Sequence, residues 1–248
     1  MHNDSIRNAS GLWPVSRLVF LGAATAVAQA ASLDVLNPSF ESPTVPNGFP
    51  AITLIDSWQK TPDPGFPPGQ WDQLSGLFEN AAVGQPRHIE NADGNQVAFL
   101  FAVQGVGISQ QLGDTFAAGV SYELSVGIRG GGALTPGTTF QVGLFYMDGS
   151  TPVTLGSTTV TATAEFATAT QLMEVFATTG AVASGAPAVG KNIGIQLLAA
   201  SNNGAPGIAY WEIDKVAVTA VPEPEAYALA FGGALLGVAG WRRWQRSR

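Results

Sequence analysis

The sequence predicts an all-β protein built as a two-sheet antiparallel sandwich. Between residues 31 and 220, short runs rich in Val, Ile, Thr, Phe and Tyr are separated by clusters of Gly, Pro and Asn. This pattern is typical of strands joined by turns. Almost nothing in the same range has the apolar period of an amphipathic helix. Closely spaced strands without intervening helices favour a sandwich over a parallel α/β fold.

Residues 1–30 are predicted to be a secretory leader, which is set aside when the fold is considered. Arg7 and Arg17 supply positive charge, Leu18–Ala28 is apolar, and Ala28-Gln29-Ala30 forms a small-x-small cleavage site for signal peptidase. The apolar stretch is too short to span a bilayer comfortably. The sequence therefore predicts a cleaved leader and an exported protein.

The body, residues 31–220, is long enough for one sizeable core. It contains five Lys/Arg against fifteen Asp/Glu, a net charge of −10. Such a body lacks the basic footprint that nucleic-acid binding needs, so no nucleic-acid partner is expected. The chain has no cysteine, which excludes disulfides, cysteine zinc ligands and cysteine nucleophiles.

Eight strands are expected along the body. The clearest is Tyr122–Arg129, in which every second residue is apolar, as a half-buried strand requires. Phe140–Met147 and Val153–Thr163 are predicted to form a hairpin with its turn at Asp148-Gly149. The remaining expected strands are Gln96–Val103, Gly107–Leu112, Gln171–Thr178, Asn192–Ala200 and Ile208–Thr219.

The segment Ser42–Pro86 differs from the rest of the body because it is rich in Pro, Gly and Asn. A loop region of this length inside a compact domain is usually functional or disordered. Its embedded aromatics, Trp58 and Trp71 among them, favour order. Trp58 stands at an expected strand start and is interpreted as a core residue.

The last 28 residues, 221–248, contain three blocks: Pro222-Glu223-Pro224, an uncharged apolar run from Ala226 to Trp241, and a basic end that includes Arg242 and Arg243. As a helix, the apolar run would be roughly 24 Å long, slightly under the usual membrane span. Basic residues after it favour a cytoplasmic end. A single transmembrane helix is predicted, with an amphipathic helix packed on a core as the alternative.

This tail resembles the PEP-CTERM sorting signal of Gram-negative, exopolysaccharide-producing bacteria. The matching residues are Pro222-Glu223-Pro224, Ala226–Gly240 and Arg242-Arg243, whereas Trp244 and Gln245 interrupt the basic cluster. The resemblance implies transient anchoring in the inner membrane and cleavage near Pro-Glu-Pro by an exosortase-type membrane protease. The body would then be released to the cell surface or into an extracellular biofilm matrix.

The body itself resembles the galactose-binding-like jelly rolls, a group that includes many carbohydrate-binding modules of secreted glycoside hydrolases. The resemblance rests on the opening Leu36–Glu41, the later Asp56-Ser57-Trp58 and the closing Trp211–Val218. It implies a jelly-roll connectivity and polysaccharide as a partner.

The closing strand independently predicts a β-bulge. Trp211 and Ile213 are in one phase of the strand, and Val216 and Val218 are in the other. All four can face the core only if the strand carries an extra residue, which we expect near Asp214-Lys215.

The galactose-binding-like resemblance also implies one structural calcium ion, held by Glu41 and Asp214. Two carboxylates with backbone carbonyls are hard oxygen ligands that suit calcium, and the bulge would turn Asp214 toward Glu41. The alternative is that both side chains only make hydrogen bonds at a corner of a sheet.

Four residues are candidates for sugar binding, in which aromatic faces and polar groups cooperate. Trp71 lies among polar residues and is the first candidate platform; a core tryptophan that pins a long loop is the alternative. Tyr146, beside the Asp148-Gly149 turn, is a second candidate. Arg87 and His88 precede a strand and can hydrogen-bond an acidic polysaccharide, or lie on a solvated strand edge.

No catalytic motif is present. The chain lacks Gly-x-Ser-x-Gly and His-Glu-x-x-His, and His88 is alone in the body. Gly130-Gly131-Gly132 lacks the setting of a phosphate-binding loop. The sequence thus predicts a non-catalytic, exported surface or matrix protein that binds polysaccharide. The alternatives are a structural envelope or biofilm protein with no sugar site, and a polysaccharide hydrolase that uses a carboxylate pair.

Overall fold

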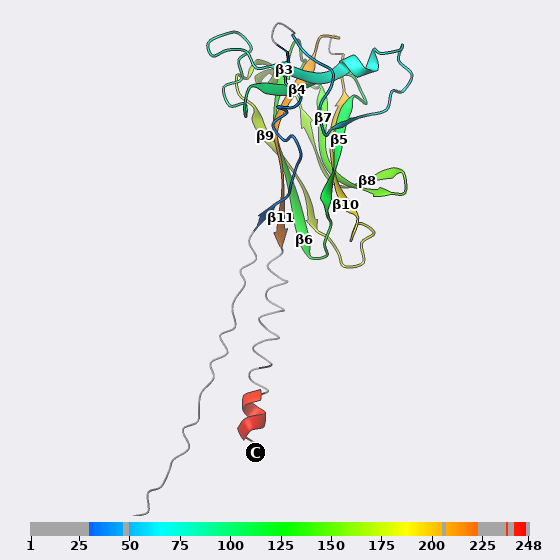
Figure 1. The fold of residues 1–248 in the computed structure, drawn as a ribbon, viewed down its shortest axis with the longest axis vertical. Helices are drawn as coiled ribbons and strands as arrows, with labels where there is room; N and C mark the ends of the chain where they lie inside the picture. Colours follow the sequence, from blue (N-terminus) through cyan, green and yellow to red (C-terminus); the bar gives the residue numbers. More distant parts are fainter. Residues whose placement is uncertain (1–29, 47–49, 205–206, 223–236, 238–240, 247–248) are drawn as a thin grey trace, which may run out of the picture.

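A computed structural model describes residues 30–46, 50–204, 207–222, 237 and 241–246. The body consists of two antiparallel sheets packed face to face (Figure 1), which confirms the all-β sandwich. Sheet A contains β1 (Ala31–Ser32), β3 (Ser75–Glu79), β4 (Gln96–Phe101), β6 (Val120–Gly131), β9 (Met173–Ala181) and β11 (Tyr210–Pro222). Sheet B contains β2 (Gln59–Lys60), β5 (Gly107–Thr115), β7 (Thr139–Asp148), β8 (Thr151–Thr161) and β10 (Asn192–Ser201). The helical elements are η1 (Trp71–Leu74) and α1 (Ala164–Thr168).

The strand order is that of a jelly roll. Neighbours in sheet A follow β3-β4-β11-β6-β9, with β1 beside β11, and neighbours in sheet B follow β2-β5-β10-β7-β8. From β4 to β11 the chain changes sheet at every connection except the β7–β8 hairpin. This alternation winds two Greek keys around one core and agrees with the connectivity that the galactose-binding-like resemblance implies.

The core lies between the sheets and follows from the period of two along the strands. In β6, Tyr122, Leu124, Val126 and Ile128 are all buried, as their spacing predicts. They meet the buried side of sheet B, where Phe140 begins the corresponding series of β7. Each such aliphatic or aromatic side chain contributes about 1.5–3 kcal/mol by leaving water. This burial stabilises a body that has no disulfide.

The two most specific local predictions are confirmed. β7 and β8 form a hairpin in which Asp148 is opposite Thr151, and Gly149 has a φ of 62° in the turn. In β11 the register against β6 shifts between Asp214 and Ala217, and Lys215 has a φ of 56°. This bulge lets both halves of β11 bury their apolar side chains.

The described part of the proline-rich segment carries three elements: β2, η1 and β3. The sequence did not predict β3, which forms the edge of sheet A beside β4. Trp58 is buried, and its Nε1 donates to Asn37 O at 3.2 Å. Trp71 is also buried, and its Nε1 donates to Thr61 O at 2.8 Å. Indoles with a satisfied N–H thus fix this segment to the sandwich.

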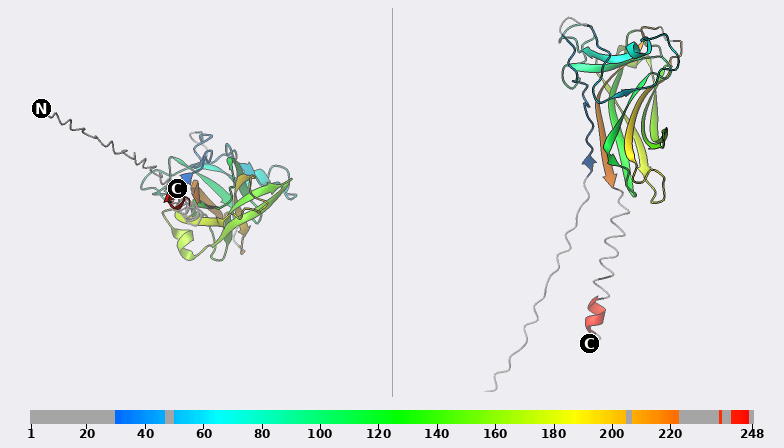
Figure 2. Two further views of the ribbon diagram at one scale, coloured as in Figure 1. Left: turned by 90° about the horizontal axis from the view of Figure 1, so that it is seen from below. Right: turned by 45° about the vertical axis from the view of Figure 1, so that its right-hand side comes forward.

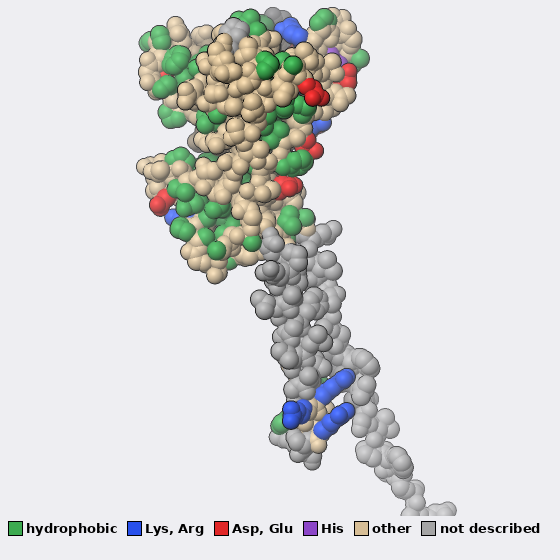
Figure 3. Space-filling view, turned by 180° about the vertical axis from the view of Figure 1, so that it is seen from behind, with side chains coloured by type: hydrophobic (Ala, Val, Ile, Leu, Met, Phe, Trp, Pro, Cys, Tyr) green, Lys and Arg blue, Asp and Glu red, His purple; other side chains and the backbone are tan. Residues whose placement is uncertain are grey.

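Both ends of the body lie at one end of the sandwich. β1 pairs with the end of β11 through Ala31 opposite Ala220, whereas β3 lies at the opposite end of the molecule (Figures 1 and 2). In the space-filling view (Figure 3), charged side chains are sparse on the visible face of the sandwich, and basic side chains gather on the helical residues 241–246. Residues 1–29 and most of the apolar tail lie outside the described residues. No helix within the described part of the chain is long and apolar enough to cross a membrane.

Candidate active site

The outer face of sheet A carries the polar residues of β11. Trp211 and Ile213 face the core and are fully buried. Because side chains alternate along a strand, Tyr210 and Glu212 face the opposite way, out of the sandwich. The same alternation that fills the core therefore places a phenol and a carboxyl group next to each other on the outer face.

Strand register builds two rows across β4, β11 and β6. In the first row, Tyr210 is opposite Phe101 on one side and Gly131 on the other. In the second row, Glu212 is opposite Phe99 and Arg129. Directly opposed side chains in a sheet lie close enough to interact. The aromatic side chains of β4 thus lie next to the carboxyl group of Glu212 on β11 and the guanidinium of Arg129 on β6.

Gly131 is required for the position of the Tyr210 ring. A Cβ placed on Gly131 would lie only 2.2 Å from Cε2 of Tyr210, well inside van der Waals contact. The ring of Tyr210 therefore lies directly over the backbone of β6. Of the three consecutive glycines 130–132, Gly130 and Gly131 belong to β6.

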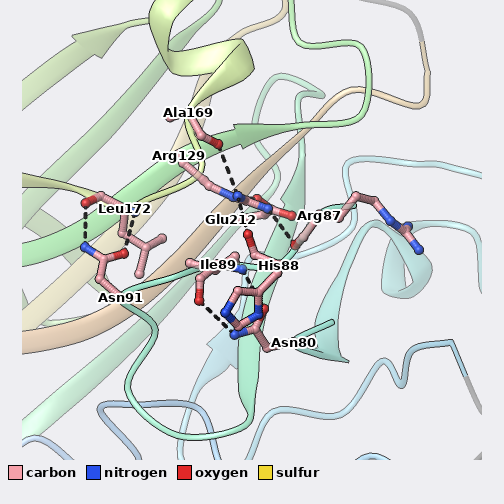
Figure 4. Close-up of polar contacts among 9 residues, drawn as sticks. All are labelled: Asn80, Arg87, His88, Ile89, Asn91, Arg129, Ala169, Leu172 and Glu212. Atoms are coloured by element: carbon pink, nitrogen blue, oxygen red, sulfur yellow. Dashed lines mark hydrogen bonds and ion pairs between the residues drawn. The ribbon is translucent and has the colours of Figure 1, made fainter. Parts of the chain in front are cut away.

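Arg129 and Glu212 form a buried ion pair, in which Nε of Arg129 donates to Oε2 of Glu212. The two residues are only 5% and 1% exposed. The other nitrogens of the guanidinium donate to backbone carbonyls: Nη2 to Arg87 at 3.1 Å, and Nη1 to Ala169 at 3.1 Å and His88 at 3.4 Å (Figure 4). The pair thus fixes two loops over the outer face of sheet A.

Two asparagine side chains hold the same loops by pairing with backbone N–H and C=O groups, as a neighbouring strand does. Asn80 exchanges two hydrogen bonds with the backbone of Ile89, at 3.0 and 2.8 Å, and Asn91 exchanges two with Leu172, at 3.0 and 2.7 Å (Figure 4). Beneath them, Ile89, Leu172 and Val97 of β4 form a small buried cluster outside the main core. One part of the outer face is therefore sealed by a packed loop.

The remaining part of the outer face is hollow and contains two adjoining cavities. The aromatic cavity, of about 490 Å³, is lined by Phe78, Phe99, Phe101 and Tyr210, together with small residues of the 50–51 and 80–82 segments. The polar cavity, of about 760 Å³, is lined by Glu212, Arg129, His88, the three glycines and residues 167–170, among others. Arg87 and Tyr210 line both cavities, so they stand at the junction.

The surroundings of Glu212 and Tyr210 favour the protonated forms of both side chains, which can donate a proton or a hydrogen bond. Burial raises the pKa of Glu212 above its usual value, although Arg129 acts in the opposite direction. Burial also raises the pKa of Tyr210, and the neighbouring Glu212 charge adds to that effect. A carboxyl group with a raised pKa that lines a cavity is suited to general acid–base chemistry.

The structure brings only two of the predicted sugar-binding residues to this site. Arg87 and His88 line the polar cavity, and Nδ1 of His88 contacts Ala81 O. Trp71 is 5% exposed and Tyr146 is 8% exposed. Neither ring presents a free face, so the alternative for Trp71, a core tryptophan that pins the long loop, describes its position. Polysaccharide binding by these residues stays a prediction.

The predicted calcium ligands meet at one turn. Oε1 of Glu41 accepts the N–H groups of Asn95 and Gln96 at 2.9 and 2.7 Å, and Oδ2 of Asp214 accepts that of Asp93 at 2.7 Å. Burial raises the pKa of Asp214 to about 7. These contacts match the hydrogen-bonding alternative. Among the described residues, no group of three or more acidic or histidine side chains is placed to hold a metal.

Sequence reasoning missed Tyr210, Glu212, Arg129, Phe99 and Phe101 as site residues. The signal that was available is the alternation Tyr210-Trp211-Glu212-Ile213, in which polar and apolar side chains take turns. What the sequence does not contain is the register that sets Glu212 against Arg129, 83 residues earlier.

Comparisons with known structures agree with this fold. A Stig cyclase from Fischerella sp. TAU, solved with (3Z)-3-(1-methyl-2-pyrrolidinylidene)-3H-indole, aligns at a TM-score of 0.61 and 20% identity, covering 78% of this chain and 99% of the cyclase. A Fischerella sp. TAU cyclase with 4-(1H-indol-3-yl)butan-2-one aligns at 0.59 and 19% identity, covering 77% and 98%. The CBM4 module aligns at a TM-score of only 0.42, which supports no conclusion about sugars. No curated protein matches the chain.

The family itself is shown by a family model. The HpiC1-like model, described as HpiC1 cyclase, matches residues 31–219, which is nearly the whole sandwich. This match overturns the prediction of a non-catalytic protein, which rested on the lack of short catalytic motifs. A site assembled across three strands of a sheet leaves no such motif. The chain belongs to the HpiC1-like cyclase family.

Proposed function

We propose that this protein is a cyclase that closes a ring on an unsaturated aromatic substrate held over the outer face of sheet A. The observation that carries the proposal is Glu212, a buried carboxyl group with a raised pKa that lines a cavity next to an aromatic wall. The indole compounds bound by the Fischerella cyclases support an indole or a similar aromatic group as part of the substrate.

The aromatic cavity supplies binding and orientation. The rings of Phe78, Phe99, Phe101 and Tyr210 have neighbouring centroids 5.8 to 6.3 Å apart. Their mutual contacts keep the wall rigid, and aromatic faces favour a flat aromatic ligand. A cavity of this size is in the range of small-molecule sites.

Glu212 supplies the proton and receives it again. In its protonated form, the Glu212 carboxyl group gives its proton to the π system of the substrate, which becomes a cation. A double bond within the substrate attacks that cation and forms the new C–C bond. Loss of a proton to the Glu212 carboxylate restores the enzyme, so the product is an isomer of the substrate. Arg129 stabilises the carboxylate while the proton is away.

Tyr210 has a supporting role at the junction. Because its pKa is raised, its hydroxyl group stays protonated at neutral pH and can donate a hydrogen bond to the substrate. Its ring also closes one side of the aromatic cavity and limits the access of water to the reacting cation.

The test is turnover by the full chain, purified in mild detergent, with indoles that carry an unsaturated side chain. Chromatography with mass detection should reveal a product of unchanged mass. Glu212→Gln should lower the rate at least 100-fold, the usual scale of general acid–base catalysis. Glu174→Gln, which changes an exposed acid on β9, should leave it unchanged. If Glu212→Gln retains the wild-type rate, the assigned role is wrong.

We also propose that the body is exported and released from a temporary membrane tether, as the PEP-CTERM resemblance implies. Pairing of Ala31 with Ala220 supports this proposal, because both processing sites would lie at one end of the sandwich, away from β3. The intact mass of the protein from its native cell tests it. Ends near Ala31 and Pro222 are expected, and a mass that includes Arg242 and Arg243 would contradict the release.

A further inference from the structure

Arg87 lines both cavities and is the cation they share. Its side chain lies near enough to Tyr210 to counteract the rise in the pKa of that phenol, and it extends away from the Arg129–Glu212 pair (Figure 4). Its backbone has a φ of 73°, a left-handed conformation that is uncommon outside glycine. Its carbonyl oxygen accepts from Arg129 at 3.1 Å. The backbone at Arg87 is thus held in a strained conformation by a residue of the buried ion pair.

Arg87 has no ion-pair partner among the described residues, although its charge counteracts the rise in the pKa of Glu212. Within the part of the chain that the structure describes, Arg129–Glu212 is the one ion pair. Glu79 lines the aromatic cavity and Glu90 the polar cavity, but neither is within ion-pair distance of Arg87. Glu90 instead accepts a hydrogen bond from Gln171 at 2.7 Å. A cation therefore stands at the mouth of both cavities with hydrogen-bonding capacity left for a ligand.

Guanidinium geometry indicates what that ligand group is. The planar fork of N–H donors matches a carboxylate, which it binds with two parallel hydrogen bonds. Arg87 is exposed and lines both cavities, so its donors are accessible to a ligand bound there. The aromatic wall begins at the same point, because Tyr210 belongs to both features. A matching ligand carries a carboxylate a short chain away from an aromatic ring.

We propose that Arg87 determines substrate specificity by pairing with a carboxylate on the aromatic substrate of this site. This inference rests on the proposed function, since it concerns the same cavities. The substrate is then an aromatic acid, and its acidic side chain binds in the polar cavity. The Arg129–Glu212 pair then has a second role, because it fixes the loop that positions Arg87.

The experiment compares two ligands of nearly the same shape and different charge. They are 3-(1H-indol-3-yl)propanoate and 4-(1H-indol-3-yl)butan-2-one, in which a carboxylate oxygen is replaced by a methyl group. Calorimetric titration of the full chain in mild detergent gives both dissociation constants. We expect the acid to bind roughly 10- to 100-fold more tightly, the size of one charged hydrogen-bonded contact, and to weaken as salt is raised.

Three variants identify the cause. Arg87→Met should abolish the preference for the acid, and Arg87→Lys should retain part of it, because an ammonium keeps the charge without the fork. Lys191→Gln removes an exposed cation on the segment before β10, outside both cavity linings, and should leave the preference intact. Unchanged melting curves confirm that the Arg87 variants are folded.

The outcomes separate this inference from the proposed function. If the ketone binds as tightly as the acid, or if the preference survives in Arg87→Met, the role of Arg87 is wrong while the aromatic site stands. If neither compound binds the wild-type chain, both are wrong. If the acid is preferred through Arg87 but no indole substrate is turned over, Arg87 recognises an anion and the cyclase proposal fails.

Discussion

Replacing Arg129 with methionine tests how the candidate site is held together. Methionine keeps an unbranched, largely apolar stem but removes every donor of the guanidinium. Glu212, which is 1% exposed, then loses its only ion-pair partner among the described residues. The carbonyl groups of Arg87 and Ala169 lose their donor as well. The substitution therefore affects both the carboxyl group and the loops above it.

The magnitude follows from the burial of the pair. Removing one partner of a buried ion pair costs about 3–5 kcal/mol, because the other charge is left without compensation. For a body of this size, each kcal/mol lowers the melting temperature by about 2–4 °C. We expect the melting temperature of Arg129→Met to fall by roughly 6–20 °C at pH 8.

The loss should depend on pH in a defined direction. Burial already raises the pKa of Glu212, and without Arg129 that pKa must rise further. A carboxyl group with a higher pKa in the folded state penalises folding only where the unfolded chain has lost the proton, above about pH 4. The penalty grows as the pH rises toward the folded-state pKa and is constant above it. Arg129→Met should thus be closer to wild type at pH 5 than at pH 8.

Chemical denaturation at both pH values measures the effect. The double variant Arg129→Met/Glu212→Met should recover much of the loss, because a buried pair replaced by apolar side chains leaves no stranded charge. Lys191→Met, at an exposed position, is the control. The reasoning is refuted if Arg129→Met is as stable as wild type at pH 8, or if the double variant loses the sum of the two single losses.

Three further predictions follow from the fold. Gly131→Ala must displace the ring of Tyr210 and should weaken the binding of indole ligands at least tenfold, as measured by calorimetry. Gly113→Ala, where a Cβ meets open space, should leave the affinity unchanged. Equal affinities of the two variants would contradict the packing of Tyr210 over Gly131. Trp71→Ala should lower the free energy of unfolding by about 3–5 kcal/mol in urea denaturation and should leave glycan binding unchanged. A variant that is as stable as wild type but has lost glycan binding would show that Trp71 is a sugar-binding platform after all. The pKa of Asp214 is about 7 in the folded state and about 4 in the unfolded chain. The free energy of unfolding, measured in EDTA, should therefore fall as the pH rises from 4 to 7. Asp214→Asn should reduce this dependence on pH. A melting temperature that rises with added calcium in the wild type but not in Asp214→Asn would show instead that ionised Asp214 holds the ion.

Much of the scaffold was predictable from local pattern. The alternation in 122–129, the Asp148-Gly149 turn and the phase change in the closing strand each express a local rule, and each is found in the structure. The edge strand β3 was missed, because prolines surround it and it pairs only through β4. Trp71 shows the opposite difficulty, since polar neighbours in sequence did not reveal that its ring is buried.

The sequence by itself determined that the body is a β-sandwich and where its core lies, because a strand's period of two is written in adjacent residues. It also marked Arg87 and His88, two members of the site. Only the tertiary structure decided that Glu212 is buried against Arg129 and that Tyr210 lies over Gly131. Both contacts depend on how β11 registers between β4 and β6. That register is set by the packing of the whole core, so no short segment of the chain encodes it.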